Sequence, residues 1–144
     1  MIKNDRQFRI TKAQVARFEA ALKELAASPR KDLHPAPRNA ETDALRSQLH
    51  DLRKEMEEYN ALKSGKRKTV ALASLDELPR TMIRARIAAG LTQEKLAAKL
   101  GLKPQQIQRY EATDYRSASM QRMNEVLRAL GVRLRYPAEL RLVS

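Results

Sequence analysis

The stretch Ala89–Glu111, which reads AGLTQEKLAAKLGLKPQQIQRYE, decides the fold of the C-terminal half of this chain. Thr92 is suited to cap the start of a short helix, and Pro104 is suited to the first position of a second helix. Gly101 lies between them, and glycine readily takes the positive φ of a sharp turn. The pattern therefore predicts two short helices joined by a tight turn.

These two helices, over residues 93–100 and 104–112, also carry the side chains that a close crossing needs. Ala97 is small enough to lie at the contact, and Ile107 is bulky enough to anchor the second helix. Together with the turn at Gly101, these positions are typical of a helix-turn-helix, whose second helix enters the major groove of DNA. The other apolar side chains expected around Ile107 are those of Leu96, Leu100, Leu102 and Tyr110.

A helix is also predicted on each side of this motif. The first begins at Leu78-Pro79 and ends at Gly90.

Residues Leu78–Gly131 as a whole resemble the Cro/C1-type (XRE, lambda-repressor-like) helix-turn-helix family, and the quoted stretch carries the resemblance. The resemblance implies a five-helix domain in which residues 117–130 pack across the back of the motif. The side chains expected to point inward from these flanking helices are Met82, Ile83, Ile87, Met120, Met123, Leu127 and Leu130.

The resemblance also implies which side chains face DNA. Gln93 matches the family position whose side chain and backbone N–H hold a phosphate. Gln105, Gln106 and Arg109 are the first choices for contacts with base edges, since glutamine pairs with adenine and arginine with guanine. Pro104 departs from the polar residue that is common at its position, which removes one contact. The full set of predicted DNA-contacting residues is Thr92, Gln93, Lys103, Gln105, Gln106, Gln108, Arg109, Tyr115 and Arg116.

The charge of the chain agrees with a polyanionic partner. The 144 residues have a formal net charge of +12. Residues 1–64 contain 13 basic and 10 acidic side chains, a net charge of +3, whereas residues 65–144 contain 16 and 7, a net charge of +9. The half that contains the helix-turn-helix is thus the one expected to contact phosphates.

The remaining composition argues against other classes of protein. The chain has no cysteine, and its two histidines, His34 and His50, have no partners at the spacing of metal ligands. No phosphate-binding loop, dinucleotide fingerprint or catalytic group is present, so we expect neither an enzyme nor a cofactor. No apolar run is long enough to span a membrane, and a cytoplasmic location is expected.

Two longer helices are predicted in the N-terminal half. The first covers Thr11–Ala27, where Thr11 and Gln14 fit a capping box. The second follows a proline-rich linker, Pro29–Asn39, and ends near Ser64, where Gly65 provides a left-handed cap. Apolar residues repeat at steps of three and four in both helices, at Val15, Phe18, Leu22 and Leu25 in the first and at Leu45, Leu49, Leu52, Met56 and Tyr59 in the second.

The sequence leaves the role of these two helices open. They can fold back as an antiparallel hairpin or pair with another chain. Their role can be purely structural, or they can form a protein–protein interaction module. The basic run Lys66–Lys68 fits either a solvated linker or a contact with DNA phosphates. We expect a first unit over residues 1–65 and a second over residues 66–144.

The C-terminal end alternates apolar and basic side chains from Val132 to Tyr136, and Leu140 and Leu142 can continue the pattern after Pro137. Such alternation is typical of a half-buried strand, and a single strand needs a partner. The predicted fold is therefore all-α, with an N-terminal hairpin or coiled-coil segment, a five-helix DNA-binding domain and one short C-terminal strand. The strand is expected to pair with a second subunit or with a partner protein.

Three functional hypotheses follow. The first is a homodimeric transcriptional repressor that binds an inverted repeat of double-stranded DNA and regulates its own operon. The second is an antitoxin of a type II toxin–antitoxin pair, because the arrangement resembles HigA-type antitoxins, which bind and neutralise a small ribonuclease toxin and also repress. The third is a DNA-bridging scaffold built on a long coiled coil, but a seam of about three heptads is short for that role.

Overall fold

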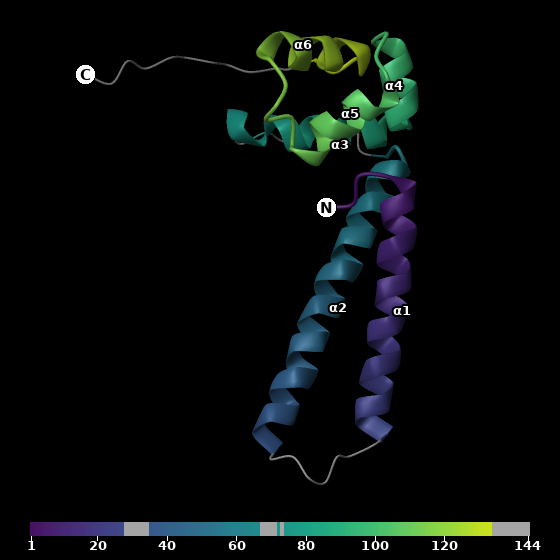
Figure 1. Cartoon of the computed structure of the whole chain (residues 1–144), viewed down its shortest axis with the longest axis vertical. Helices are drawn as coiled ribbons and strands as arrows, with labels where there is room; N and C mark the ends of the chain where they lie inside the picture. The colour runs from purple at the N-terminus through teal and green to yellow at the C-terminus, as the bar shows by residue number, and fades with distance from the viewer. Residues whose placement is uncertain (28–34, 67–71, 73, 134–144) are drawn as a thin grey trace, which may run out of the picture.

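The computed structural model describes residues 1–27, 35–66, 72 and 74–133. These residues form an all-α fold with six α-helices and one 3-10 turn, and no strand occurs within them. Two long helices make an arm that projects from a compact group of four shorter helices (Figure 1). The elements are α1 (Asp5–Ala27), α2 (Pro35–Lys63), η1 (Leu75–Glu77), α3 (Leu78–Ala88), α4 (Gln93–Lys99), α5 (Pro104–Ala112) and α6 (Met120–Ala129).

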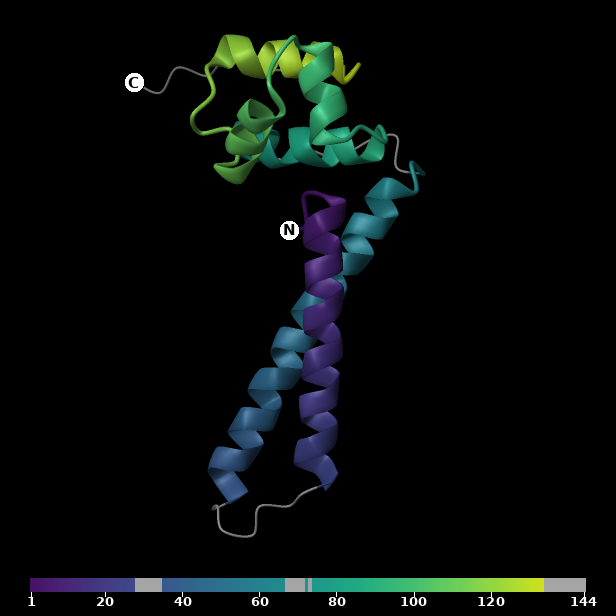
Figure 2. The same ribbon diagram turned by 45° about the vertical axis from the view of Figure 1, so that its right-hand side comes forward.

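The arm is an antiparallel hairpin of α1 and α2, so the two helices pair within the chain (Figure 2). The apolar repeats predicted from the sequence form the seam between them. Among the residues of α2 whose burial is described, Leu49, Tyr59 and Leu62 are the fully buried apolar side chains, and they lie in the half that approaches the shorter helices. There the rings of Phe8 and Tyr59 stack with centroids 5.4 Å apart. Towards the far end of the hairpin, Leu22 and Leu45 are only half-buried.

Helix α1 begins six residues earlier than predicted. Its N-cap is Asn4, whose Oδ1 accepts a hydrogen bond from the Gln7 backbone N–H at 2.9 Å. The Gln7 side chain accepts one in return from the Lys3 backbone N–H at 2.8 Å. Thr11, the predicted cap, is instead buried inside the helix. The prediction was wrong because two sites fit the capping pattern, and the earlier one is fixed by the packing of the N-terminus.

Helix α2 also begins earlier than expected, at Pro35, so the predicted linker Pro29–Asn39 is shorter. Pro35 and Pro37 fall in the first turn, whose backbone N–H groups have no partner within a helix, and a proline there loses no hydrogen bond. Residues 28–34 lie outside the described part of the chain. The end of α2 agrees with the prediction, because Gly65 has a φ of 67° and its N–H donates to the carbonyl oxygen of Leu62 at 3.0 Å.

The four shorter helices surround one apolar core. Ile83 from α3, Leu96 and Ala97 from α4, and Ile107 from α5 are completely buried, as the sequence predicted. Val126 of α6 completes this core. These side chains pack behind the helix-turn-helix and hold α5 in place, so that the opposite face of α5 is exposed to solvent.

The prediction for α6 was partly wrong. The helix begins at Met120, capped by the Ser119 hydroxyl, which accepts a hydrogen bond from the Arg122 backbone N–H at 3.1 Å. Met120 is therefore in the first turn, 70% exposed, and Val126 takes the inward place. Leu127 is buried as predicted.

The C-terminal half contains four α-helices and the turn η1 in its described residues, so a fifth helix of the expected domain is not found there. Val132 and Arg133 have no regular structure. The rest of the predicted strand, from Leu134 onward, lies outside the described residues, as do residues 67–71 and 73.

The hairpin and the shorter helices share a continuous core. Ile2, Tyr59 and Leu62 from the N-terminal half belong to the same buried cluster as Leu78 and Met82 of α3. Polar contacts reinforce this junction: Lys3 Nζ lies 2.8 Å from Asp114, and Arg84 lies 2.9 Å from Glu58. The base of the arm is therefore anchored both by apolar packing and by ion pairs.

Candidate nucleic-acid interface

The turn between α4 and α5 has the geometry predicted for a helix-turn-helix. Gly101 has a φ of 65°, and the backbone N–H of Leu102 donates to the carbonyl oxygen of Ala97 at 2.9 Å. Thr92 caps α4 by accepting a hydrogen bond from the Lys95 backbone N–H at 3.2 Å. No atom lies within 4 Å of a Cβ built on Gly101, so glycine is required there for its backbone conformation and not for space.

The outer face of α5 is a row of polar side chains. Gln105, Gln108 and Arg109 are exposed, whereas Ile107 between them is completely buried. Lys103, in the turn before the helix, is also exposed. Because Ile107 fixes the rotation of the helix, the polar row is presented outward in one defined orientation.

Gln106 is exposed as well, but part of its side chain is already engaged. Its Oε1 accepts a hydrogen bond from the Lys103 backbone N–H at 3.0 Å, which caps the start of α5. Only its amide nitrogen remains to donate to another group. This local role makes Gln106 less free to reach a base edge than Gln105 or Arg109.

Gln93 is not on the surface as expected. Its side chain is 7% exposed, its Nε2 donates to Glu111 Oε2 at 2.8 Å, and its Oε1 accepts from Asn4 Nδ2 at 3.3 Å. Both polar atoms of the amide are thus engaged inside the protein. This placement corrects the expectation of a phosphate-holding side chain, because the N-terminus of the chain covers it.

The position of Tyr115 also differs from the prediction, which made it a DNA-contacting residue. It is 2% exposed and stacks on Tyr110 with centroids 6.0 Å apart. Asp114 and Tyr115 have φ values of 47° and 56°, and this left-handed turn directs the ring into the core. Burial raises the pKa of the Tyr115 hydroxyl above its ordinary value. Arg116, the next predicted contact, is exposed.

A buried ion pair that the sequence analysis missed lies behind the recognition helix. Arg86 of α3 and Glu111 of α5 are 3% and 0% exposed, and Arg86 Nη2 donates to Glu111 Oε2 at 2.8 Å. The guanidinium also donates to the carbonyl oxygens of Leu91 at 2.8 Å and Lys3 at 2.6 Å. The one available signal was an arginine on the apolar face of α3, since a buried charge requires a partner.

The N-terminal segment completes this network from outside. Lys3 Nζ donates to the carbonyl oxygen of Glu111, at the end of α5, and to Asp114 Oδ1 at 2.8 Å. These contacts hold the pKa of the Asp114 carboxyl below its ordinary value, with the Lys3 hydrogen bond as the main cause. The start of the chain is thus tied directly to the last turn of the recognition helix.

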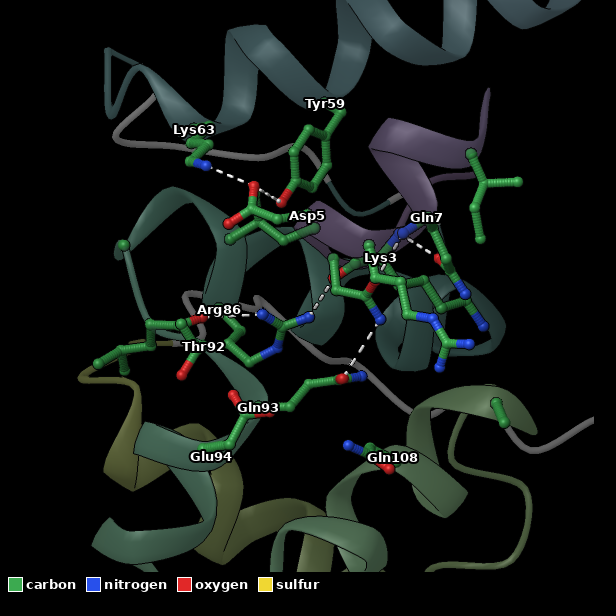
Figure 3. Close-up of a pocket in the computed structure, with 17 residues that line it drawn as sticks. Lys3, Asp5, Gln7, Tyr59, Lys63, Arg86, Thr92, Gln93, Glu94 and Gln108 are labelled. Carbon is green, nitrogen blue, oxygen red and sulfur yellow. Dashed lines mark hydrogen bonds and ion pairs between the residues drawn. The ribbon is translucent and has the colours of Figure 1, made fainter. Parts of the chain in front are cut away.

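A pocket of about 570 Å³ lies where the start of α1 meets α4 and α5 (Figure 3). Residues of all three helices line it, among them Arg6 and Ile10 from α1, Gln93 from α4, and Gln108 and Ala112 from α5. Gln93 and Gln108 lie on the side opposite the N-terminal segment (Figure 3). The pocket therefore joins the outer face of α5 to the base of the hairpin.

Among the described residues, no group of three or more histidine, cysteine, aspartate or glutamate side chains could hold a metal ion. None of the helices that the structure describes combines the length and the apolar character of a membrane span.

Comparison with known proteins gives one match. The sequence over residues 82–136 matches the family described as Helix-turn-helix, a stretch that includes α4, α5 and α6. No curated protein and no solved structure matches the chain. The family match and the geometry of α4 and α5 agree that residues 82–136 contain a helix-turn-helix of the Cro/C1 type.

Proposed function

We propose that this protein is a cytoplasmic transcriptional repressor that inserts α5 into the major groove of its operator. The observation that carries the proposal is the two-sided character of α5. Ile107 and Glu111 are completely buried and fix the helix, while Gln105 and Arg109 stand exposed on its outer face. A helix held rigidly with donors and acceptors on its free face is what direct reading of base pairs requires.

The exposed residues divide into two roles. We assign base contacts to Gln105 and Arg109 first, with Gln108 beside them and the Gln106 amide nitrogen as a further donor. Arginine recognises guanine through two hydrogen bonds, and glutamine recognises adenine in the same way. Thr92, Lys103 and Arg116 border this face and are assigned to the phosphate backbone, which fixes the position of the helix but does not select sequence.

We further propose that the protein acts as a homodimer on an inverted repeat, with half-sites roughly one helical turn apart. A two-fold protein matches a two-fold site, and residues 132–144, with their alternating pattern, are suited to pair with a second subunit. In this arrangement residues 66–144 form the DNA-binding and dimerisation unit, and residues 1–65 form an interaction unit that packs against it.

The proposal is tested by selecting bound duplexes from a pool of random sequence. The wild-type protein is expected to enrich an inverted repeat, and Arg109→Ala is expected to lose preference at one position in each half-site. A single misread base pair costs about 1–3 kcal/mol, so the loss is visible in the enrichment profile. Arg116→Ala is the matched control, since loss of a phosphate contact weakens binding to all DNA sequences equally. An unchanged profile for Arg109→Ala contradicts the docking of α5.

A second function, the antitoxin, is favoured by the shape of the arm. Helices α1 and α2 project away from the DNA-binding domain, and the apolar seam at their far end is only half-buried, as at Leu22 and Leu45 (Figure 2). A partner that covers this end would bury the remaining apolar surface, as a neutralised toxin would. The test is co-expression with each neighbouring open reading frame. A toxic neighbour that is rescued and co-purifies supports this function, and the absence of any such neighbour argues against it.

A further inference from the structure

The first turns of α1 lie beside the recognition helix, although they are about one hundred residues away in sequence. Arg6 and Ile10 of α1 share the walls of one pocket with Gln108 and Ala112 of α5. Gln108 belongs to the outward polar row of α5. Any ligand that covers that row therefore approaches the start of α1 as well.

The dimensions of DNA make this position significant. An α-helix with its side chains is about 10–12 Å across, and the major groove is about 12 Å wide, so an inserted helix nearly fills the groove. The phosphate backbones then run along both flanks of the helix. Side chains that share a wall with α5 are consequently placed next to a backbone and not next to the bases.

The basic charge of the first helix is concentrated at this end. Residues 1–13 contain four basic side chains and one acidic one, a net charge of +3. Residues 14–27, the rest of α1, contain two basic and two acidic side chains, a net charge of zero. Along α1 the basic excess thus lies in the turns that adjoin the shorter helices.

Of the basic side chains at this end of α1, Arg6, Arg9 and Lys12 are exposed and take part in no ion pair within the described residues. Lys3 forms an ion pair with Asp114. Arg6 and Arg9 lie one turn apart on α1. Guanidinium groups bind phosphate oxygens through two parallel hydrogen bonds, so an unpaired, exposed pair of arginines suits a phosphodiester backbone.

We propose that the first two turns of α1 form a second DNA-binding surface, in which Arg6 and Arg9 bind the phosphate backbone that flanks the groove entered by α5. The inference rests on the proposed function, because it takes the position of the duplex from α5. It extends DNA binding beyond the matched domain of residues 82–136 to the N-terminal hairpin.

The test uses the full chain and a short duplex of random sequence, with the dissociation constant measured over a range of salt concentrations. Each lost phosphate contact lowers the slope of log K against log salt by about 1. Arg6→Gln and Arg9→Gln are each expected to lower it by about that amount and the double variant by about 2. The affinity for all DNA sequences should fall equally. Lys23→Gln, an exposed site further along α1, is the matched control and should leave the slope unchanged.

Arg6→Lys keeps the charge and should restore the salt slope, which separates loss of a phosphate contact from loss of structure. Melting temperatures that match the wild type show that the variants fold. A wild-type slope in the double variant overturns the inference while the proposed function stands. Failure of the wild type to bind any duplex overturns both. If the double variant changes self-association but not DNA binding, the surface takes a second copy of the chain and the inference is wrong.

Discussion

The two halves of this molecule bury their side chains in different ways. In the DNA-binding half, four short helices enclose residues such as Ile83, Leu96 and Ile107 from all sides. In the hairpin, two long helices share one seam, which is buried near its base at Leu62 and only half-buried at its far end. Short helices gain their stability from tertiary packing, so the first half is rigid where it must present α5, and the far end of the second half is free to take a partner.

The difference extends to the ion pairs. Arg86–Glu111 is completely enclosed and satisfied by further hydrogen bonds, whereas Arg53–Glu19 in the hairpin lies about half exposed on both sides. A buried pair that loses one member leaves an uncompensated charge, while an exposed pair that loses one member is solvated by water. Loss of one charged partner is thus expected to destabilise the fold strongly at Arg86–Glu111 and only slightly at Arg53–Glu19.

The largest expected effect is therefore that of Glu111→Gln. The substitution leaves the Arg86 charge without its partner and is expected to lower the free energy of unfolding by about 3–5 kcal/mol. The matched change in the hairpin, Glu19→Gln, should lower it by less than about 1 kcal/mol. Urea denaturation followed by circular dichroism measures both. Equal effects in the two variants would contradict the comparison.

The second prediction compares the stability contributed by a leucine at the base of the hairpin with that contributed by a leucine at its far end. Leu62→Ala removes a side chain that is completely buried and should cost about 2–5 kcal/mol. Leu22→Ala removes one that is half-buried, and the cost should be clearly smaller because water fills the space. The same denaturation experiment applies. A larger loss for Leu22→Ala would show that the far end of the arm is the more tightly packed.

A third, smaller effect concerns the turn of the helix-turn-helix. Gly101→Ala places a Cβ on a residue whose φ is 65° and should cost about 1–2 kcal/mol. Gly101→Asn should cost less, since asparagine tolerates this conformation better than other residues with a side chain. Because open space surrounds the site, a steric clash would not explain the loss. Equal stability of the alanine variant and the wild type would contradict the assignment of a left-handed turn.

The smallest effect is a pH dependence at the junction of the two halves. Lys3 lowers the pKa of Asp114 below its ordinary value of 3.8, so this carboxylate stabilises the fold above that pH and its contribution is lost as the pH falls through the lowered pKa. Asp114→Asn keeps a residue that accepts positive φ and removes the charge. It should cost less than about 1 kcal/mol at neutral pH, and the difference from the wild type should vanish in acid. A difference that persists in acid would exclude the ion pair as its cause.

Much of the fold could be predicted because it follows from local pattern. The helix-turn-helix is specified by Thr92, Ala97, Gly101 and Ile107, each of which meets a requirement within one short stretch. The seam of the hairpin follows from the spacing of its apolar residues. Both kinds of information are contained in neighbouring residues. The structure agrees with the predicted helix-turn-helix and with the apolar seam, whereas the sequence left open whether the two long helices pair within the chain.

What could not be predicted depends on contacts between distant parts of the chain. Asn4–Gln7 and Thr11–Gln14 fit the capping pattern equally well, and the burial of Ile2 against the shorter helices decides between them. The covering of Gln93 by Asn4, and the pairing of Arg86 with Glu111, are likewise long-range. The arginine on the apolar face of α3 indicates that a partner is needed, but a single sequence does not show which residue supplies it.

The most direct test of the central claim, that α5 reads the major groove, is methylation interference on the enriched duplex. Methyl groups on guanine N7 project into the major groove, and those on adenine N3 project into the minor groove. The account predicts that guanine N7 methylation blocks binding in both half-sites and that Arg109→Ala abolishes this effect at one guanine in each. Interference confined to adenine N3, or an identical pattern in Arg109→Ala, would contradict it.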